Sequence, residues 1–139
     1  MKTIHSFLAV ALIAIVAVGC GKVEKILPKK DGTWTTTKQV EREYENDVLQ
    51  STDDTISVSE FTFQDDGSGT YVEGGASYAF TWSVNDDNDE ISVCESFSGV
   101  SFCFTYDIVE SSKDAQKWYG EIVDDNFRTE LELELARKD

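Results

Sequence analysis

Histidine is almost absent from this chain of 139 residues: the only one is His5, and the only methionine is Met1. No imidazole therefore follows residue 5. A Ser-His-Asp triad, a Cys-His pair and histidine-ligated metal sites all need an imidazole in the folded body. The scarcity of histidine excludes those chemistries, and we expect a protein that is not an enzyme and that has no cofactor and no metal site.

Positive charge is also scarce, because 12 Lys and Arg stand against 27 Asp and Glu, for a net charge of −15. Residues 32–139 are more acidic still, with seven basic side chains against 25 acidic ones. A body this acidic repels phosphate backbones, so nucleic acid is not an expected partner. Residues 20–31 contain four lysines, which suit either the surface of an anionic membrane or a solvated linker.

The acidic residues form short runs, such as Asp65-Asp66, Asp124-Asp125 and the stretch 86–90. Clustered carboxylates are ligands that Ca²⁺ prefers, which raises the hypothesis of a calcium site. None of the runs has the spacing of an EF-hand loop. Because Asp and Asn also favour turns, we interpret these runs as solvated turns.

Apolar residues at helical spacing are missing after Gly32, and Pro28 is the only proline. Alternation with a period of two is frequent instead, and is clearest at Thr129–Leu135, where leucine alternates with glutamate. This pattern is typical of strands with one buried and one solvated face. The predicted strands are Trp34–Glu41, Ile56–Gln64, Gly69–Val72, Tyr78–Val84, Ile91–Phe97, Val100–Val109, Trp118–Val123 and Thr129–Leu135.

Clusters of turn-forming residues separate these stretches. About eight short strands with tight connections predict an all-β fold, an antiparallel up-and-down meander. Such a sheet protects its edges best by closing into a small barrel. Residues 43–53 fit a loop, a helical turn or a ninth strand equally well.

Long hydrophobic runs are absent, since the apolar stretch from Phe7 to Val18 is shorter than the roughly 20 residues that a membrane-spanning helix needs. Lys2 precedes this stretch and small residues follow it, the layout of a secretory signal peptide. Residues 17–20, Ala-Val-Gly-Cys, resemble the lipobox of bacterial lipoproteins. The resemblance implies a signal peptide at 1–19, a lipidated Cys20 that begins a tether over 20–31, and a folded domain over 32–139. It also implies an exported protein that is anchored to a membrane by lipid.

Only two cysteines remain in the expected domain, Cys94 and Cys103. Ser98-Gly99 is a two-residue turn, so residues whose numbers sum to 197 should face each other across a hairpin. The two cysteines fall on a non-hydrogen-bonded pair, with Cα atoms about 4.5 Å apart, within reach of a disulfide. We expect a structural disulfide on the wet face, and a redox pair is the alternative, although nothing nearby lowers a thiol pKa.

Aromatic residues fall mostly on the inward positions of the predicted strands. They could line a ligand cavity or fill the barrel, since the interior of an eight-stranded barrel is just wide enough for side chains to fill. Both interpretations stay open at this stage. The candidate ligand-lining residues are Phe61, Phe63, Tyr78, Phe80, Trp82, Phe102 and Phe104.

The body also resembles the lipocalin-like domain of small exported lipoproteins, especially those of Bacteroidetes. The likeness lies in Gly32-Thr33-Trp34, in Phe61-Thr62-Phe63 followed by Asp66-Gly67, in Tyr78–Trp82, and in the last strand, which ends at Arg137. It implies that Trp34 closes one barrel end and packs against Arg137, with Arg128 as a substitute.

The two resemblances together imply a place at the outer membrane, on its periplasmic face or at the cell surface. They further imply a non-catalytic module that binds a small apolar ligand or a protein partner in the envelope. The alternative is a structural or interaction lipoprotein with a filled core and no small-molecule ligand.

Overall fold

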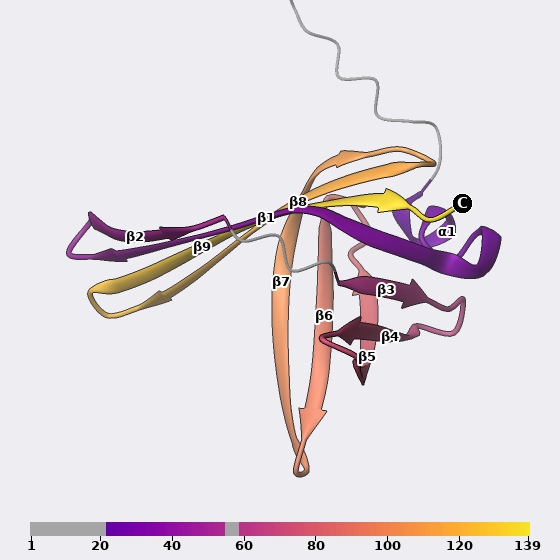
Figure 1. The fold of residues 1–139 in the computed structure, drawn as a ribbon, viewed down its shortest axis with the longest axis horizontal. Coiled ribbons are helices and arrows are strands. Elements are labelled where there is room, and N and C mark those ends of the chain that lie inside the picture. Colours follow the sequence, from indigo (N-terminus) through magenta and orange to yellow (C-terminus); the bar gives the residue numbers. More distant parts are fainter. Residues whose placement is uncertain (1–21, 55–58) are drawn as a thin grey trace, which may run out of the picture.

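The structure, a computed structural model, describes residues 22–54 and 59–139. Nearly all of them belong to antiparallel strands, which confirms the predicted all-β class (Figure 1). A short helix, α1, and a single 3₁₀ turn, η1, precede the strands. The elements are α1 (Val23–Ile26), η1 (Lys30–Gly32), β1 (Thr33–Glu45), β2 (Val48–Asp53), β3 (Glu60–Phe63), β4 (Ser68–Glu73), β5 (Ala76–Val84), β6 (Glu90–Phe97), β7 (Val100–Ser111), β8 (Ala115–Asp124) and β9 (Phe127–Arg137).

Eight of these strands close into the predicted barrel. Strands β3 to β9 pair in sequence order, and β1 joins the two ends by pairing with β3 on one side and β9 on the other. The remaining strand, β2, pairs only with the second half of β1. The stretch 43–53, for which three structures were open, is thus the end of β1 and a ninth strand. The turn between them is Asn46-Asp47, and both residues have the positive φ that a tight hairpin turn of this kind needs.

One end of the barrel is closed by α1 and η1. Val23, Ile26 and Leu27 are buried in the main hydrophobic cluster, and the indole N–H of Trp34 donates a hydrogen bond of 2.9 Å to the carbonyl of Leu27. The prediction that residues 20–31 form a tether is therefore wrong for the part that the structure describes. Val23, Ile26 and Leu27 are spaced as i, i+3 and i+4, which places them on one face of a helical turn that seals the barrel.

The core lies next to this closed end and is mainly aromatic. Phe63 is its centre: its ring packs edge-on against Phe80, Trp82 and Trp118, at centroid distances of 5.3, 5.4 and 6.0 Å. Such edge-to-face pairs are a favoured arrangement of aromatic rings. Gly69 lets the Phe80 ring lie directly on the backbone of β4, where a Cβ atom would collide with the ring and with the Thr62 carbonyl oxygen.

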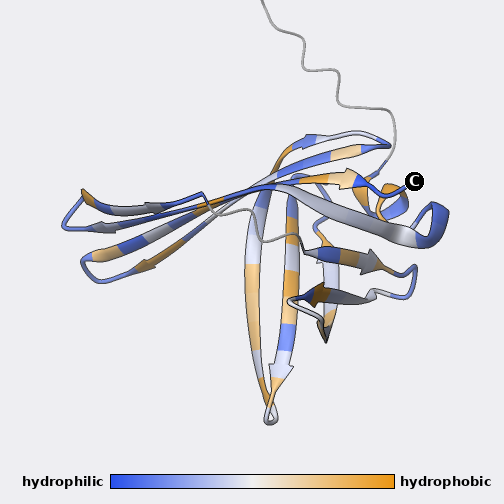
Figure 2. Cartoon of the chain, in the orientation of Figure 1, coloured by the Kyte–Doolittle hydropathy of each residue, from blue (hydrophilic) through white to orange (hydrophobic). Residues whose placement is uncertain are grey.

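The opposite end of the barrel is flared. Strands β7 and β8 stay paired only from Ser111 to Tyr106 on β7, where Tyr106 faces Gly120. Beyond that point β7 continues with β6 as one hairpin, and β8 continues with β9, β1 and β2 as a four-stranded arm (Figure 1). Figure 2 shows that hydrophobic residues continue along the hairpin of β6 and β7 after the two groups of strands have separated. The barrel therefore has a wide mouth.

No helix within residues 22–54 and 59–139 has the length and apolar character needed to cross a membrane.

Candidate ligand-binding cup

A cavity of about 570 Å³ occupies the flared part of the barrel, between the aromatic core and the mouth. Its volume falls in the range of roughly 300–1,000 Å³ that small-molecule sites typically have. We call it the cup. It is lined by Gln39, Glu41, Ser59, Phe61, Tyr71, Glu73, Val93, Glu95, Phe102, Cys103, Phe104, Tyr106, Trp118, Ile122, Leu131, Glu132 and Leu133.

The inner end of the cup is set by Trp118, whose side chain is only 1% exposed. Its ring packs against Phe63 of the core at 6.0 Å and against Tyr106 of the wall at 6.0 Å. At the mouth, by contrast, Phe102 is 63% exposed and Phe97 is 76% exposed. The cup thus runs from a dry aromatic floor to a rim at which large apolar side chains meet solvent.

The seven aromatic residues predicted to line a ligand cavity divide into two groups. Phe61, Phe102 and Phe104 line the cup. The other four do not: Phe63, Phe80 and Trp82 are buried in the core beneath it, the position that the alternative of a filled barrel gives them. Tyr78 is 45% exposed and stacks on Tyr71 at 4.9 Å.

Several wall residues were missed as ligand-lining candidates. Tyr71 pairs with Phe61 across β3 and β4, and Tyr106 lies on the same face of β7 as Phe102 and Phe104. Leu131 and Leu133 come from the alternating stretch of β9. The alternation of each strand contained the signal for all of them, since an inward position on a strand that faces the cup is enough to line it.

The closed end holds the two residues that the lipocalin-like resemblance singles out. The Arg137 guanidinium lies over the Trp34 ring, with its central carbon 4.2 Å from the ring centroid. It also donates hydrogen bonds to the carbonyls of Ile26 (2.8 Å), Lys29 (2.5 Å) and Lys113 (2.6 Å). The suggested substitute, Arg128, lies over the Tyr44 ring in the outer arm instead.

Acidic side chains stand on the cup wall, where Glu41, Glu73 and Glu95 come from β1, β4 and β6. The Tyr71 hydroxyl donates a hydrogen bond of 3.4 Å to Glu95. Burial raises the pKa of Tyr71, and the nearby Glu95 and Glu73 carboxylates raise it further. Burial, followed by the charge of Glu95, also raises the pKa of Tyr106, to about 12. Both phenols therefore stay protonated in the neutral range.

The Lys and Arg side chains of the described residues do not line the cup. On the outer face of β1, β8 and β9 they form a ladder with the glutamates of β9: Lys38 Nζ is 2.7 Å from Glu132 Oε1, and Lys117 Nζ is 3.5 Å from the same oxygen. Hydrogen bonding with Lys38 lowers the pKa of Glu132. Glu132 is therefore neutralised from outside the barrel, although the residue also contributes to the cup wall.

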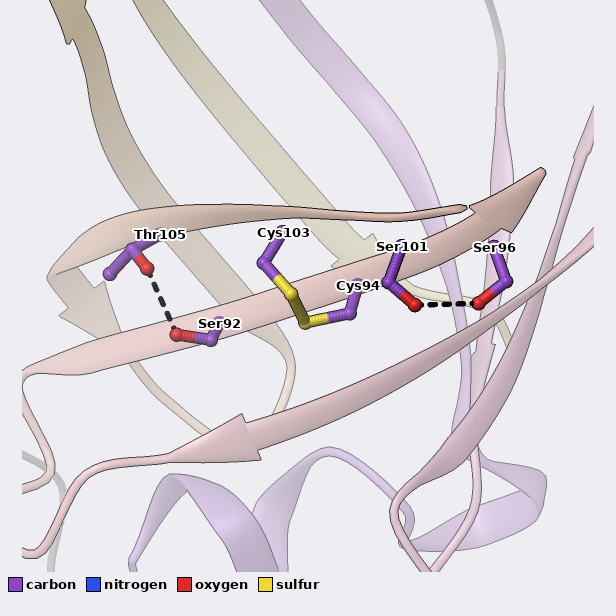
Figure 3. The surroundings of a disulfide bond; sticks show 6 residues. All are labelled: Ser92, Cys94, Ser96, Ser101, Cys103 and Thr105. Carbon is purple, nitrogen blue, oxygen red and sulfur yellow. Dashed lines mark hydrogen bonds between the residues drawn. A yellow bond between two sulfur atoms is a disulfide. The ribbon is translucent and has the colours of Figure 1, made fainter. Parts of the chain in front are cut away.

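The predicted disulfide is confirmed, together with the register from which it was derived. Cys94 pairs with Cys103 across β6 and β7, with Cα atoms 4.0 Å apart and a disulfide between them. Hydrogen bonds between the side chains of Ser92 and Thr105 and of Ser96 and Ser101 flank it on the same face (Figure 3). This is the face opposite Phe102 and Phe104. Cys20, the predicted lipid site, lies outside the described residues.

The acidic runs make local hydrogen bonds in their turns. The Asn85 side-chain oxygen accepts hydrogen bonds from the backbone N–H groups of Asp89 and Glu90, and an Asp66 carboxylate oxygen accepts one from that of Ser68. Across the parts of the chain that the structure describes, no group of three or more His, Cys, Asp or Glu side chains is arranged to hold a metal ion.

Neither a comparison with protein-family models nor a comparison with curated proteins finds a match to this sequence.

Proposed function

We propose that this protein is a lipid-anchored binding module of the cell envelope that holds a small, largely apolar molecule in its cup. The observation that carries the proposal is the cup itself, a cavity of about 570 Å³ with walls from Phe61, Phe104, Tyr106 and Leu133. Binding sites for small molecules are typically concave and mostly apolar, with a few polar groups that orient the ligand.

The competing function, a structural lipoprotein with a filled barrel, requires the interior to be occupied by side chains. The aromatic core fills only the part of the barrel next to α1. The flare between β7 and β8 widens the rest, and the cavity lies along the apolar wall there. A bound molecule would cover this wall at a gain of roughly 25 cal/mol per Å² of apolar surface buried.

The anchoring part of the proposal is supported by the sequence alone, through the apolar segment before Cys20 and its likeness to a lipobox. Its test is the mass of the protein purified from its own host. We expect Cys20 to be the first residue and to carry lipid, and we expect the Cys20→Ala variant to leave the membrane fraction. A mature protein that keeps Met1, or an unmodified Cys20, would contradict it.

Ligand binding can be tested with the uncharged fluorescent probe N-phenyl-1-naphthylamine. We expect one probe per protein, with fluorescence enhanced by the dry wall of the cup. The variant Leu131→Trp narrows the cup, so the probe can no longer fit fully against the wall. We expect probe binding to weaken at least about tenfold, which corresponds to a loss of about 1.4 kcal/mol. Native mass spectrometry of protein from its own host should show a bound small molecule.

Val123→Trp is the matched control, because Val123 is 62% exposed, lies on the same arm and does not line the cup. It adds the same bulk and should leave probe binding unchanged. The proposal fails if the probe does not bind, or if both tryptophan variants bind it as the unmodified protein does.

A further inference from the structure

We propose that the cup selects amphipathic cations, molecules with a positively charged head such as an alkylammonium and an apolar tail. This inference rests on the proposed function, because it names the ligand class of the same cavity. It draws on two observations, the distribution of charge between the inside and the outside of the barrel and the surroundings of Glu95. A third, an unsatisfied buried donor on Trp118, bears on whether the cup holds a ligand at all.

The first observation is that the cup has carboxylates but no basic side chain. Glu41 and Glu95 line it, and neither forms an ion pair with a Lys or Arg among the described residues. Each basic residue after Gly32 has a carboxylate within 4.0 Å, and none of these basic residues lines the cup. The basic residues are Lys38, Arg42, Lys113, Lys117, Arg128, Arg137 and Lys138. One of the carboxylates, that of Glu132, also contributes to the cup wall.

This separation makes the inside of the cup electronegative. Carboxylates in a partly dry cavity interact with a charge more strongly than they would in water. An anionic ligand would be repelled, whereas a cation would supply the counter-charge that the chain itself provides only outside the barrel.

The second observation concerns Glu95, which interrupts an otherwise apolar face of the β6–β7 hairpin. Its neighbours across the sheet are Phe80 on β5 and Phe102 on β7, and the Tyr71 hydroxyl donates to its carboxylate. A carboxylate among aromatic rings is well suited to an ammonium group, because ring faces attract cations while the carboxylate provides the opposite charge. The apolar face around Glu95 accommodates the tail of the same molecule.

The third observation is independent of charge. The Trp118 indole N–H is buried and has no hydrogen-bond partner among the residues that the structure describes, although Trp118 lines the cup. Leaving a buried donor without an acceptor costs about 1–3 kcal/mol. An acceptor atom on a bound molecule would remove this cost, so the donor supports occupation of the cup by a ligand and does not bear on the charge of that ligand.

The inference is tested with three ligands that share a ten-carbon chain: decyltrimethylammonium, decanol and decanoate. Each is titrated below its micellar concentration against N-phenyl-1-naphthylamine bound to the protein. We expect the cation to displace the probe at concentrations about tenfold lower than decanol, the size of one charge-assisted contact, and decanoate to be weakest.

Three variants locate the preference. Glu95→Gln and Glu41→Gln remove a charge from the cup, and each should reduce the affinity for decyltrimethylammonium several-fold while leaving that for decanol unchanged. Glu134→Gln removes the same charge from the outer ladder, where Glu134 lies 3.6 Å from Lys38, and should change neither. Circular dichroism confirms that each variant is folded.

The outcomes separate the inference from the proposed function. If decanol and decanoate displace the probe as well as the cation does, the cup binds apolar molecules without charge selection and the inference is overturned. The inference is also overturned if Glu95→Gln and Glu41→Gln prefer the cation over decanol as strongly as the unmodified protein does. The net charge of the body would then explain the preference. If the probe itself does not bind, the proposed function fails and the inference fails with it.

Discussion

The Arg137 side chain contacts more segments of the chain than any ion pair on the surface of the molecule does. Its side chain is 3% exposed, and its guanidinium stacks on Trp34 of β1 while donating to carbonyls of α1, of the segment before η1 and of the turn between β7 and β8. Hydrogen bonds from a charged donor contribute more than neutral ones, and the planar guanidinium is suited to several at once. Arg137 therefore fastens the closed end to the barrel.

Replacing Arg137 by Met keeps most of the side chain's length and removes all of these hydrogen bonds. We expect the free energy of unfolding to fall by about 3 kcal/mol, measured by urea denaturation. Hydrogen exchange should accelerate in residues 23–32, which lose the hydrogen bonds to the carbonyls of Ile26 and Lys29. Arg128→Met is the matched control, since Arg128 also stacks on a ring, that of Tyr44 at 4.0 Å, but lies on the outer ladder. Equal losses in the two variants would contradict a special role for Arg137.

Tyr106 gives the cup wall a measurable dependence on pH. Burial and the charge of Glu95 raise its pKa to about 12, whereas an unfolded chain loses the same proton near pH 10. Between these values the folded state holds a proton that the unfolded state has released, so stability falls as pH rises. The slope from this residue is about 1.4 kcal/mol per pH unit.

The variant Tyr106→Phe lacks this titration. The free energy of unfolding should decrease between pH 9.5 and pH 11.5 in both proteins. We expect the decrease to be about 2 kcal/mol smaller in Tyr106→Phe than in the unmodified protein, as measured by urea denaturation at both pH values. Tyr78→Phe is a suitable control, because the Tyr78 side chain is 45% exposed. If the two variants lose stability in parallel, Tyr106 titrates like an exposed phenol and the expectation is wrong.

At the scale of elements, the hairpin of β6 and β7 is unusual because it extends beyond the strands that flank it. β5 pairs with β6 only between Ile91 and Glu95, and β8 leaves β7 at Tyr106. Near its tip the hairpin is held mainly by its own ladder, the disulfide and the side-chain hydrogen bond between Ser96 and Ser101. The disulfide therefore stabilises the part of the cup wall that has the least support from neighbours.

The double variant Cys94→Ser, Cys103→Ser tests this support. Closing a loop with a sequence separation of 9 residues is expected to contribute about 2–3 kcal/mol to stability. We expect that loss on urea denaturation, together with faster hydrogen exchange at residues 97–104 and weaker probe binding, because Phe102 and Phe104 lie on this hairpin. Unchanged exchange in the hairpin would show that the ladder alone holds it.

The strands of this fold could be predicted from sequence because alternation reports directly on which side of a sheet each residue occupies. The hairpin at Ser98-Gly99 is the clearest example, since its turn fixes every pair from Phe97–Val100 to Cys94–Cys103. The seal formed by α1 was not predicted. Val23, Ile26 and Leu27 make a single helical turn, too short to stand out as periodic, and its burial depends on the barrel end that it covers.

The cup was predicted less completely, for a geometrical reason. Alternation separates inward from outward positions but gives no depth along the barrel axis. Phe63 and Phe61 are both on β3 and both inward, yet Phe63 is in the core and Phe61 lines the cup. Depth depends on where strands β7 and β8 separate, which is a property of the closed sheet. The sequence showed Glu95 only as a charged residue that interrupts the apolar face of the hairpin of β6 and β7.

At the scale of the whole molecule, four lysines are concentrated in one short segment, residues 20–31, of an otherwise acidic protein. Lys22, Lys25, Lys29 and Lys30 are exposed on and around α1 and η1 at the closed end. The cup and its rim carry Glu41, Glu73 and Glu95. Anionic lipid headgroups attract lysines within about a Debye length, and they repel carboxylates. The lysines therefore favour contact of the closed end with an anionic membrane, and the acidic turn around Asn88, which accepts a hydrogen bond from the Val23 backbone N–H, opposes it. With Cys20 lipidated as proposed, the anchor adds to the attraction at this end.

We expect this orientation in the lipidated protein on vesicles that contain anionic lipid and headgroup nitroxides. A fluorophore attached at Lys25→Cys should be quenched strongly, and one at Ser98→Cys, at the tip of the hairpin of β6 and β7, should be quenched weakly. Substituting Gln for Lys22, Lys29 and Lys30 should reduce the difference in quenching between these two positions. Equal quenching at the two sites would show that the barrel tumbles freely about its anchor.

The burial of Val23 sets how far the barrel can stand from a lipid on Cys20. Val23 is three positions after Cys20, a reach of at most about 10 Å even when fully extended. With Cys20 lipidated as proposed, the sealed end is held against the bilayer and the mouth opens into the aqueous space beyond it. A ligand would then have no direct route from the anchoring membrane into the cup, so loading and release would take place on the far side, by exchange with water or with another molecule that approaches from there.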